Sequence, residues 1–267
     1  MKLNEKNRVK YFTFDKLENE GIRHCFSTRV GGVSQGCYES LNLAFRDDKR
    51  ENVFENYNRI CTAIGVDSRN TVWTRQVHTD NILRVSEADR GKGLFKERQQ
   101  DGYDAVITDC KDVVLTGFSA DCVLIFYYDR VNNAIGIAHS GWRGTVIETG
   151  AKTVRAMEKE FGTRAEDLIC CIAPAIAKCC FQVDKPVADE FAEKLPWSSE
   201  FIEKDSENEG KFYIDLHSVN EEILVKAGVK RDNIENSRFC TKCHPELFYS
   251  HRLMGNERGS LAGMISL

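Results

Sequence analysis

Four apolar segments follow one another between residues 104 and 138, each about as long as one β-strand. Short turn signals separate them, such as the run Cys110-Lys111-Asp112 and the asparagine-bearing run 129–133. Helical spacing of apolar residues occurs before this region, over residues 51–64, and after it, in a segment that ends near Gly162. Strands clustered between helices predict a mixed α+β (mixed α/β) fold with helices covering the sheet faces.

Capping and turn residues bound several other elements. Gly65 can end the helix over residues 51–64, Pro186 suits the first turn of a helix to Leu195, and Asp215 suits the N-cap of a helix closed by Gly228. A polar stretch from 203 to 211 is typical of an exposed loop or hairpin tip. Further strands are expected at residues 22–27, 71–77, 82–85 and 168–172.

The composition is that of an ordinary globular protein. The chain has 267 residues, of which 42% are apolar and 29% charged, and this is enough to bury a core. Because no long linker rich in proline, glycine or serine interrupts the sequence, we expect a single domain over residues 1–267.

Charge and hydropathy exclude two classes of partner. The formal net charge is −4, from 37 basic and 41 acidic residues, so no basic excess predicts nucleic-acid binding. No stretch approaches the roughly 18 apolar residues that a membrane-spanning helix needs, so we expect no membrane association. The first residues contain no apolar signal segment, so we expect a cytoplasmic protein. The sequence does not predict the oligomeric state.

Eleven cysteines are present, and in a cytoplasmic protein we expect them to be reduced thiols that mostly fill the core. Two pairs are adjacent, Cys170-Cys171 and Cys179-Cys180. Neighbouring side chains of a strand point to opposite faces, so such a pair is not expected to supply two ligands to one site.

A candidate metal site comes from two of the six histidines and one cysteine. His78 and His139 each follow an apolar strand pattern, and Cys122 stands at the start of another. Strand ends that lead into loops commonly display functional groups. Three nitrogen and sulfur ligands leave a fourth tetrahedral position for water or substrate, as in catalytic zinc sites. Two alternatives stay open here: ordinary core positions, and a metal-free nucleophile, Cys122, with His139 as its base.

At these residues the sequence resembles a family named variously as laccase-like polyphenol oxidase, peptidoglycan editing factor and purine nucleoside phosphorylase. The resemblance spans roughly Cys25 to Leu267. Its motifs are segments 27–34 (STRVGGVS), 76–80 (QVHTD), 119–123 (SADCV), 138–144 (AHSGWRG), 171–176 (CIAPAI) and 240–252 (CTKCHPELFYSHR). Several independent motifs in the same order make the match specific.

The resemblance implies that His78, Cys122 and His139 are the metal ligands and the centre of catalysis, with zinc as the cofactor. Two small departures, Ser140 where alanine is common and Ala173 where glycine is common, remove no ligand. The implied fold is a single α/β domain with mixed sheets sandwiched between helices. It agrees with the pattern of elements above.

Family members are similar to enzymes that phosphorolyse adenosine, inosine and S-methyl-5′-thioadenosine and that also deaminate adenosine. The resemblance therefore implies a purine nucleoside phosphorylase with adenosine deaminase side activity, acting on nucleosides and phosphate. The usual nucleotide-deaminase signature is absent, so deamination would need another arrangement. Asp104, Asp121 and His244 are candidate proton shuttles only because they lie near the motifs.

Three residues are candidates for substrate binding. Arg29, in a glycine-bearing loop, and Arg143, four residues after His139, could each grip phosphate with a planar guanidinium. Trp142 could cover a purine face, together with Phe248 or Tyr249. The structural alternatives are an exposed loop charge for Arg29, a structural stack or pair for Arg143, and ordinary core packing for the aromatic residues.

Other activities remain as alternatives. A set of two histidines and one cysteine can also accept copper, so laccase-like polyphenol oxidase activity of a copper-loaded form is possible. Six histidines, none in a His-x-His pair, are too few for several copper centres. A hydrolase that edits peptidoglycan precursors is a further alternative. Cys240 and Cys243 form a single Cys-x-x-Cys, which alone is weak evidence for redox chemistry or for a second zinc. We interpret it as structural or site-lining, without a catalytic role.

Overall fold

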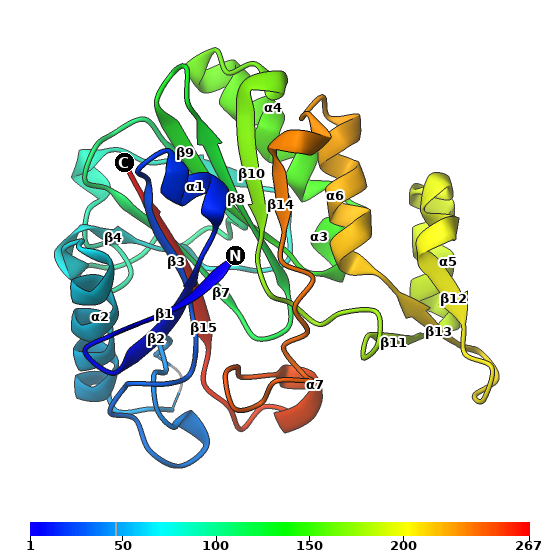
Figure 1. Cartoon of the computed structure of the whole chain (residues 1–267), viewed down its shortest axis with the longest axis horizontal. Helices are drawn as coiled ribbons and strands as arrows, with labels where there is room; N and C mark the ends of the chain where they lie inside the picture. The colour runs from blue at the N-terminus through cyan, green and yellow to red at the C-terminus, as the bar shows by residue number, and fades with distance from the viewer. Residues whose placement is uncertain (46) are drawn as a thin grey trace.

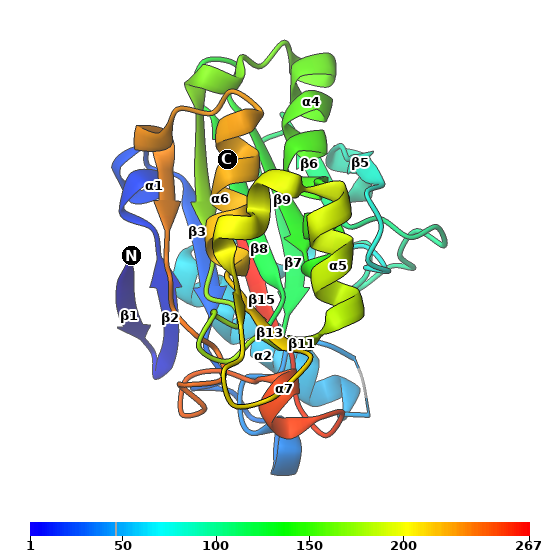
Figure 2. The same ribbon diagram turned by 90° about the vertical axis from the view of Figure 1, so that its right-hand side faces the viewer.

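The computed structural model describes residues 1–45 and 47–267, and in these residues the strands form three sheets (Figures 1 and 2). The first contains, in order, β1 (Lys2–Lys6), β2 (Val9–Thr13), β3 (Arg23–Ser27), β15 (Leu261–Ser266), β7 (Val114–Ser119) and β4 (Thr71–Val72). The second contains β14 (Ile234–Asn236), β10 (Leu168–Ile172), β8 (Val123–Asp129), β9 (Ala134–Ser140), β6 (Ala105–Thr108) and β5 (Ile82–Arg84). The third contains β11 (Gln182–Asp184), β13 (Lys211–Ile214) and β12 (Ile202–Lys204). Both large sheets are mixed, since β4–β7, β5–β6 and β10–β14 pair in parallel and their other pairs are antiparallel.

The α-helices are α1 (Asp15–Asn19), α2 (Arg50–Ile64), α3 (Trp142–Val146), α4 (Thr149–Phe161), α5 (Lys185–Lys194), α6 (Leu216–Lys226) and α7 (His251–Met254). Short 3-10 helices lie at η1 (Gly36–Tyr38), η2 (Ser68–Asn70), η3 (Glu87–Asp89), η4 (Ala165–Asp167), η5 (Pro196–Phe201) and η6 (Arg231–Asn233). No described helix is both long enough and apolar enough to cross a membrane.

The two large sheets pack face to face, with helices on their outer sides. Phe26 and Leu261 of the first sheet share a buried cluster with Phe126 and Ile137 of the second. Gly263 of β15 permits this close approach, because a Cβ there would lie 2.7 Å from the Phe126 ring. Helix α2 covers the outer face of the first sheet, and α4 and α6 cover the second (Figure 1). The predicted α+β class with mixed sheets sandwiched between helices is confirmed.

Local predictions from turn and capping residues are also confirmed. Gly65 ends α2 in the left-handed conformation, with φ of 76°, and Asp215 caps α6 by accepting a 3.1 Å hydrogen bond from the Ser218 backbone N–H. The polar stretch 203–211 includes the tip of the antiparallel hairpin β12–β13. This hairpin, β11 and α5 form a unit beyond α6 (Figure 1).

One predicted strand is wrong. Residues 71–77 were expected to form a continuous strand, but β4 contains only Thr71 and Val72. Farther along, the backbone N–H groups of Val77, His78 and Thr79 donate to the carboxylate of Asp104 and not to a neighbouring strand. His78 itself has a φ of 62°, which a strand does not accommodate. His78 therefore lies in a loop held by a side chain, while His139 lies within β9, one residue beyond its expected end.

Candidate metal centre

The three predicted ligands meet in space. The ligand atoms of His78, Cys122 and His139 all lie within 4.8 Å of one another. Cys122 immediately precedes β8, whose Leu124 pairs with His139 of the adjacent β9, so the sheet register brings the cysteine and this histidine together. The two imidazole rings have centroids 4.8 Å apart and are inclined at 63°.

Asp104, just before β6, holds both histidines in position. One carboxylate oxygen lies 2.8 Å from His139 Nδ1 and accepts a 3.0 Å hydrogen bond from the His78 backbone N–H. The other oxygen accepts hydrogen bonds from the N–H groups of Val77 and Thr79. With Nδ1 engaged by Asp104, His139 Nε2 is the nitrogen left for a metal, and a carboxylate behind a histidine is the usual support of a zinc ligand.

The electrostatics of the two histidines differ. Burial lowers the pKa of His139, but the interactions with Cys122 and the hydrogen bond to Asp104 outweigh burial and raise the pKa to about 9. The pKa of His78 is lowered, first by burial and then by repulsion from His139. The pKa of Asp104 is lowered because hydrogen bonds, that from His139 first, outweigh its burial. Without a metal, His139 therefore carries a proton that a metal would have to displace.

Gly141 leaves open space beside two of the ligand atoms. A Cβ at this position would lie 2.9 Å from Cys122 Sγ and 3.1 Å from His78 Nδ1. Only glycine leaves this space next to two ligand atoms. The donor set of two imidazoles and a thiolate, with a carboxylate behind one imidazole, suits zinc and leaves one tetrahedral position open. The residues therefore fit the metal that the sequence predicts.

A cavity of about 560 Å³ opens over His78 and Cys122, and His139 lies behind them, outside its lining. Its wall contains both aromatic and cationic side chains: Trp142, Phe181, Arg143, Arg252 and Arg258, beside His78 and Cys122. The Arg143 guanidinium stacks over the Trp142 ring, 4.2 Å from its centroid. The volume lies in the range of small-molecule sites. Two of the predicted substrate-binding residues, Trp142 and Arg143, therefore line the same cavity as His78 and Cys122.

The structure places the third predicted residue, Arg29, elsewhere. Its guanidinium donates to the carbonyl oxygens of Glu39 and Pro245 and stacks on the Tyr249 ring. Arg29 is not among the residues that line the cavity over the metal ligands. Its predicted contact with phosphate stays a prediction. Phe248 or Tyr249 was expected to cover a purine face together with Trp142. This prediction is wrong, because both side chains are completely buried.

Asp121, one of the candidate proton shuttles, lines the cavity, and so does Arg252, for which the sequence predicted no role. The Asp121 carboxylate accepts hydrogen bonds from the hydroxyls of Thr241 and Ser250 and from the backbone N–H of Arg252. It thereby fastens the segment around 241–252 to the loop that carries Cys122. Of the three proton-shuttle candidates, only Asp121 lines the cavity, since Asp104 lies behind the ligands and His244 faces Glu246 and Phe239. The motif 240–252 was the available signal for this segment.

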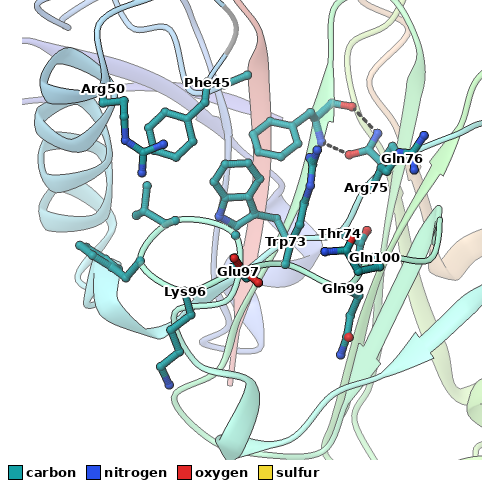
Figure 3. A pocket seen from close by; sticks show the side chains of 16 residues that line it. Phe45, Arg50, Trp73, Thr74, Arg75, Gln76, Lys96, Glu97, Gln99 and Gln100 are labelled. Carbon is teal, nitrogen blue, oxygen red and sulfur yellow. Dashed lines mark hydrogen bonds between the residues drawn. The ribbon is translucent and has the colours of Figure 1, made fainter.

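A second cavity, of about 880 Å³, lies beside the segment that leads to His78 (Figure 3). Phe45, Arg50 and Trp73 point into it, and Gln76 is fixed there by two hydrogen bonds with the backbone of Phe118. None of the three metal ligands lines it. Size alone therefore does not locate the metal site.

All eleven cysteines are free thiols. Cys170 and Cys171 are buried in β10, as expected for core residues. The expectation that adjacent cysteines diverge is wrong for Cys179 and Cys180. These two lie in a turn, where strand alternation does not apply, and their sulfur atoms are 3.8 Å apart.

Comparison with known families identifies the family of this chain. The sequence model of the family described as "Multi-copper polyphenol oxidoreductase laccase" matches residues 23–267. The chain belongs to this family. Within the described residues, His78 and His139 are the two histidines of the laccase-family chain that join a ligand cluster. His24 and His217 are buried in other places. The single His–Cys–His cluster thus differs from the several copper centres that the family's description suggests.

Relatives of the chain carry a different name. The chain is 33% identical over 251 residues to "Purine nucleoside phosphorylase YlmD" of Bacillus subtilis, covering 93% of this chain and 90% of the relative. It is 33% identical over 265 residues to "Purine nucleoside phosphorylase" of Bacteroides thetaiotaomicron, covering 98% and 97%. Among solved structures, the hypothetical protein YfiH of Bacillus licheniformis superposes with a TM-score of 0.91 at 30% identity, covering 99% and 98%.

Proposed function

We propose that this chain is a zinc-dependent purine nucleoside phosphorylase acting on adenosine, inosine and S-methyl-5′-thioadenosine, with adenosine deaminase side activity. One observation carries the proposal: a nucleoside-sized cavity places the His78–Cys122–His139 cluster beside Trp142 and three arginines. The printed names of the relatives support the reaction type. We assign this activity to a single catalytic domain of residues 1–267.

In phosphorolysis, an oxygen of inorganic phosphate forms a bond to C1′ of the ribose while the bond from C1′ to the purine nitrogen breaks. The purine leaves with the electron pair and takes up a proton. Arg143 can hold the phosphate dianion, because a guanidinium group binds two phosphate oxygens at once. Arg29 is retained as a candidate from its motif. Trp142 offers an aromatic face for the purine. The Arg143 guanidinium, which stacks on the Trp142 ring, lies at the same wall of the cavity.

Asp104 acts as a positioning residue. It fixes the backbone around His78 and the ring of His139, and so orients both ligands of the cluster. The chemistry that zinc supplies when bound is Lewis acidity, which lowers the pKa of water and polarises an oxygen ligand. The deaminase side activity would replace the amino group of adenine by the oxygen of a water molecule, with ammonia as the leaving group, and His78, Cys122 and His139 would hold the zinc that supplies this acidity.

Product analysis with one substrate tests both activities. Purified protein is incubated with adenosine in the presence and absence of phosphate. We expect adenine and ribose 1-phosphate only when phosphate is present, and a slower release of inosine and ammonia in either case. If inosine and ammonia form while adenine never does, the protein is a deaminase and the phosphorylase proposal is wrong.

The competing hydrolase, including one that acts on peptidoglycan precursors, would use Cys122 as a covalent nucleophile with His139 as its base. A metal-bound thiolate resists alkylation, whereas a free thiolate beside an imidazolium reacts quickly. Zinc-loaded protein should therefore resist iodoacetamide at Cys122, and chelator-treated protein should be labelled there. A substrate adduct on Cys122 in metal-free, fully active protein would favour the hydrolase.

A further inference from the structure

Four cysteine thiols gather at a second place in the fold. The sulfur of Cys243 lies 3.7 Å from that of Cys179 and 3.5 Å from that of Cys180, and the sulfurs of Cys179 and Cys180 are 3.8 Å apart. The sulfur of Cys240 completes a group whose four members all lie within 4.8 Å of one another. The metal ligands described above take no part in this group, and its interpretation does not depend on the proposed phosphorylase activity.

These separations match one coordination geometry. A tetrahedral zinc–thiolate site has zinc–sulfur bonds of about 2.3 Å, so the edges of its sulfur tetrahedron measure about 3.8 Å. A disulfide would need sulfurs about 2.05 Å apart. We propose that Cys179, Cys180, Cys240 and Cys243 bind one zinc ion as a structural tetrathiolate site.

The backbone brings the two halves of the site together. Ala175 and Cys240 form a parallel bridge, in which the Ala175 N–H donates to the Phe239 carbonyl and the Thr241 N–H donates to the Ala175 carbonyl. Cys179 and Cys180 lie in the turn that follows the first segment, and Cys240 to Cys243 form the turn that follows the second. A Cys-x-x-Cys turn is the usual way for one short segment to supply two zinc ligands.

A backbone N–H donor and a cationic side chain lie at the four-cysteine group. The Ala177 N–H lies 3.4 Å from the Cys240 sulfur, to which it donates. The Arg252 guanidinium donates to the carbonyls of Cys180 and Gln182. Four thiolates with one Zn²⁺ carry a net charge of −2, and this guanidinium is a cation beside that charge. Cys179 and Cys243 are exposed, so an ion can enter from solvent.

The position of the site indicates its role. Four protein ligands leave no open coordination position, which is typical of structural zinc. Phe181 and Gln182, next to Cys180, line the cavity over the first metal cluster, and Thr241, next to Cys240, is hydrogen-bonded to Asp121 of that cavity. The zinc would therefore fasten together the two loops that form one wall of the cavity.

Metal analysis tests the proposal on the full chain. We expect two zinc ions per wild-type chain and one in the Cys122→Ala, His139→Ala double variant. X-ray absorption of the zinc that remains should show sulfur ligands only. Cys243→Ser should remove one zinc from the wild-type chain, whereas Cys37→Ser, at another exposed cysteine, should remove none. Loss of the structural zinc should also lower the melting temperature.

Cobalt substitution keeps the test decisive if Cys243→Ser fails to fold. In the double variant, added Co²⁺ should give the intense visible bands of tetrahedral cobalt with thiolate ligands. The proposal is overturned if the double variant binds no metal, if the ion bound there is iron, or if protein isolated under reducing conditions contains a disulfide between these cysteines. Each outcome is read without any assay of activity.

Discussion

His139 Nδ1 lies 2.8 Å from the Asp104 carboxylate, and the same carboxylate oxygen accepts the backbone N–H of His78. One buried acid thus sets the ring orientation of one ligand and the backbone conformation of the other. His78 adopts a φ of 62°, and these hydrogen bonds hold the residue in that uncommon conformation. The geometry of the metal cluster consequently depends on a residue outside the ligand set.

Replacing Asp104 by asparagine should weaken zinc binding at this cluster by about 10- to 100-fold, the usual effect of losing a carboxylate behind a histidine ligand. Asparagine keeps the size but removes the charge that supports His139. Asp109→Asn, at an exposed acid paired with Arg84, is the matched control and should leave zinc affinity unchanged. Competition with a chelator measures both. Equal affinities in the two variants would show that Asp104 does not support the site.

Zinc affinity at the same cluster should fall with decreasing pH. Because the pKa of metal-free His139 is about 9, zinc must displace one proton at every pH below that value, whereas His78, with a lowered pKa, is already neutral at pH 7. The apparent dissociation constant should rise about tenfold for each unit from pH 8 to pH 7. Competition with a chelator measures this dissociation constant, in protein whose four-cysteine group already holds zinc. An affinity independent of pH would exclude the protonated His139.

The arginines of the cavity should control the use of phosphate. Arg143→Ala should raise the KM for phosphate about 10- to 100-fold, since a hydrogen bond to a charged group contributes about 1.5–3 kcal/mol. Arg143→Lys keeps the charge but loses the planar guanidinium, so its KM for phosphate should lie between those of the wild type and of Arg143→Ala. Arg29→Ala should raise this KM less, because its guanidinium already donates to two carbonyls. A larger rise in this KM for Arg29→Ala than for Arg143→Ala would show that phosphate is recognised at the loop of Arg29.

Local sequence signals predicted much of the fold. Apolar runs with turn residues identified the strands of the second sheet, and Gly65, Pro186 and Asp215 marked helix ends, because these residues act through their own backbone and side-chain chemistry. The loop before His78 was missed because its conformation depends on Asp104, a distant residue in sequence. β1 and β2 lay outside the predicted elements, since the alternation of apolar and polar residues in them is weak, although they pair with each other as a local hairpin and β2 pairs with β3.

The candidate site was predictable only in part. The ligands His78, Cys122 and His139 followed from motifs, and the structure brings them together. Arg252 could not be assigned a place, because it reaches the cavity through the hydrogen bonds of Asp121. The four-cysteine group was missed for a physical reason: adjacent cysteines diverge in a strand, and nothing in the local pattern placed Cys179 and Cys180 in a turn.

The stability of the fold should depend on pH through buried histidines. Burial lowers the pKa of His217 to about 4, against about 6.5 in the unfolded chain. The unfolded state therefore binds more protons between these values, so stability is complete above pH 6.5 and falls as the pH drops toward 4, by roughly 3 kcal/mol from this residue. Urea unfolding at several pH values measures it. His217→Leu should reduce the slope by about 1.4 kcal/mol per pH unit, and an unchanged slope would contradict this.

The most direct test of the proposed function follows the fate of phosphate itself. Inosine and phosphate are incubated with wild-type protein, with the Cys122→Ala, His139→Ala variant and with Cys37→Ala as control, and ³¹P NMR records the products. We expect ribose 1-phosphate to form in amounts equal to hypoxanthine with the wild-type and control proteins, and not with the double variant. Intact inosine at all phosphate concentrations, free ribose without phosphate, or full activity of the double variant would contradict phosphorolysis at this metal cluster.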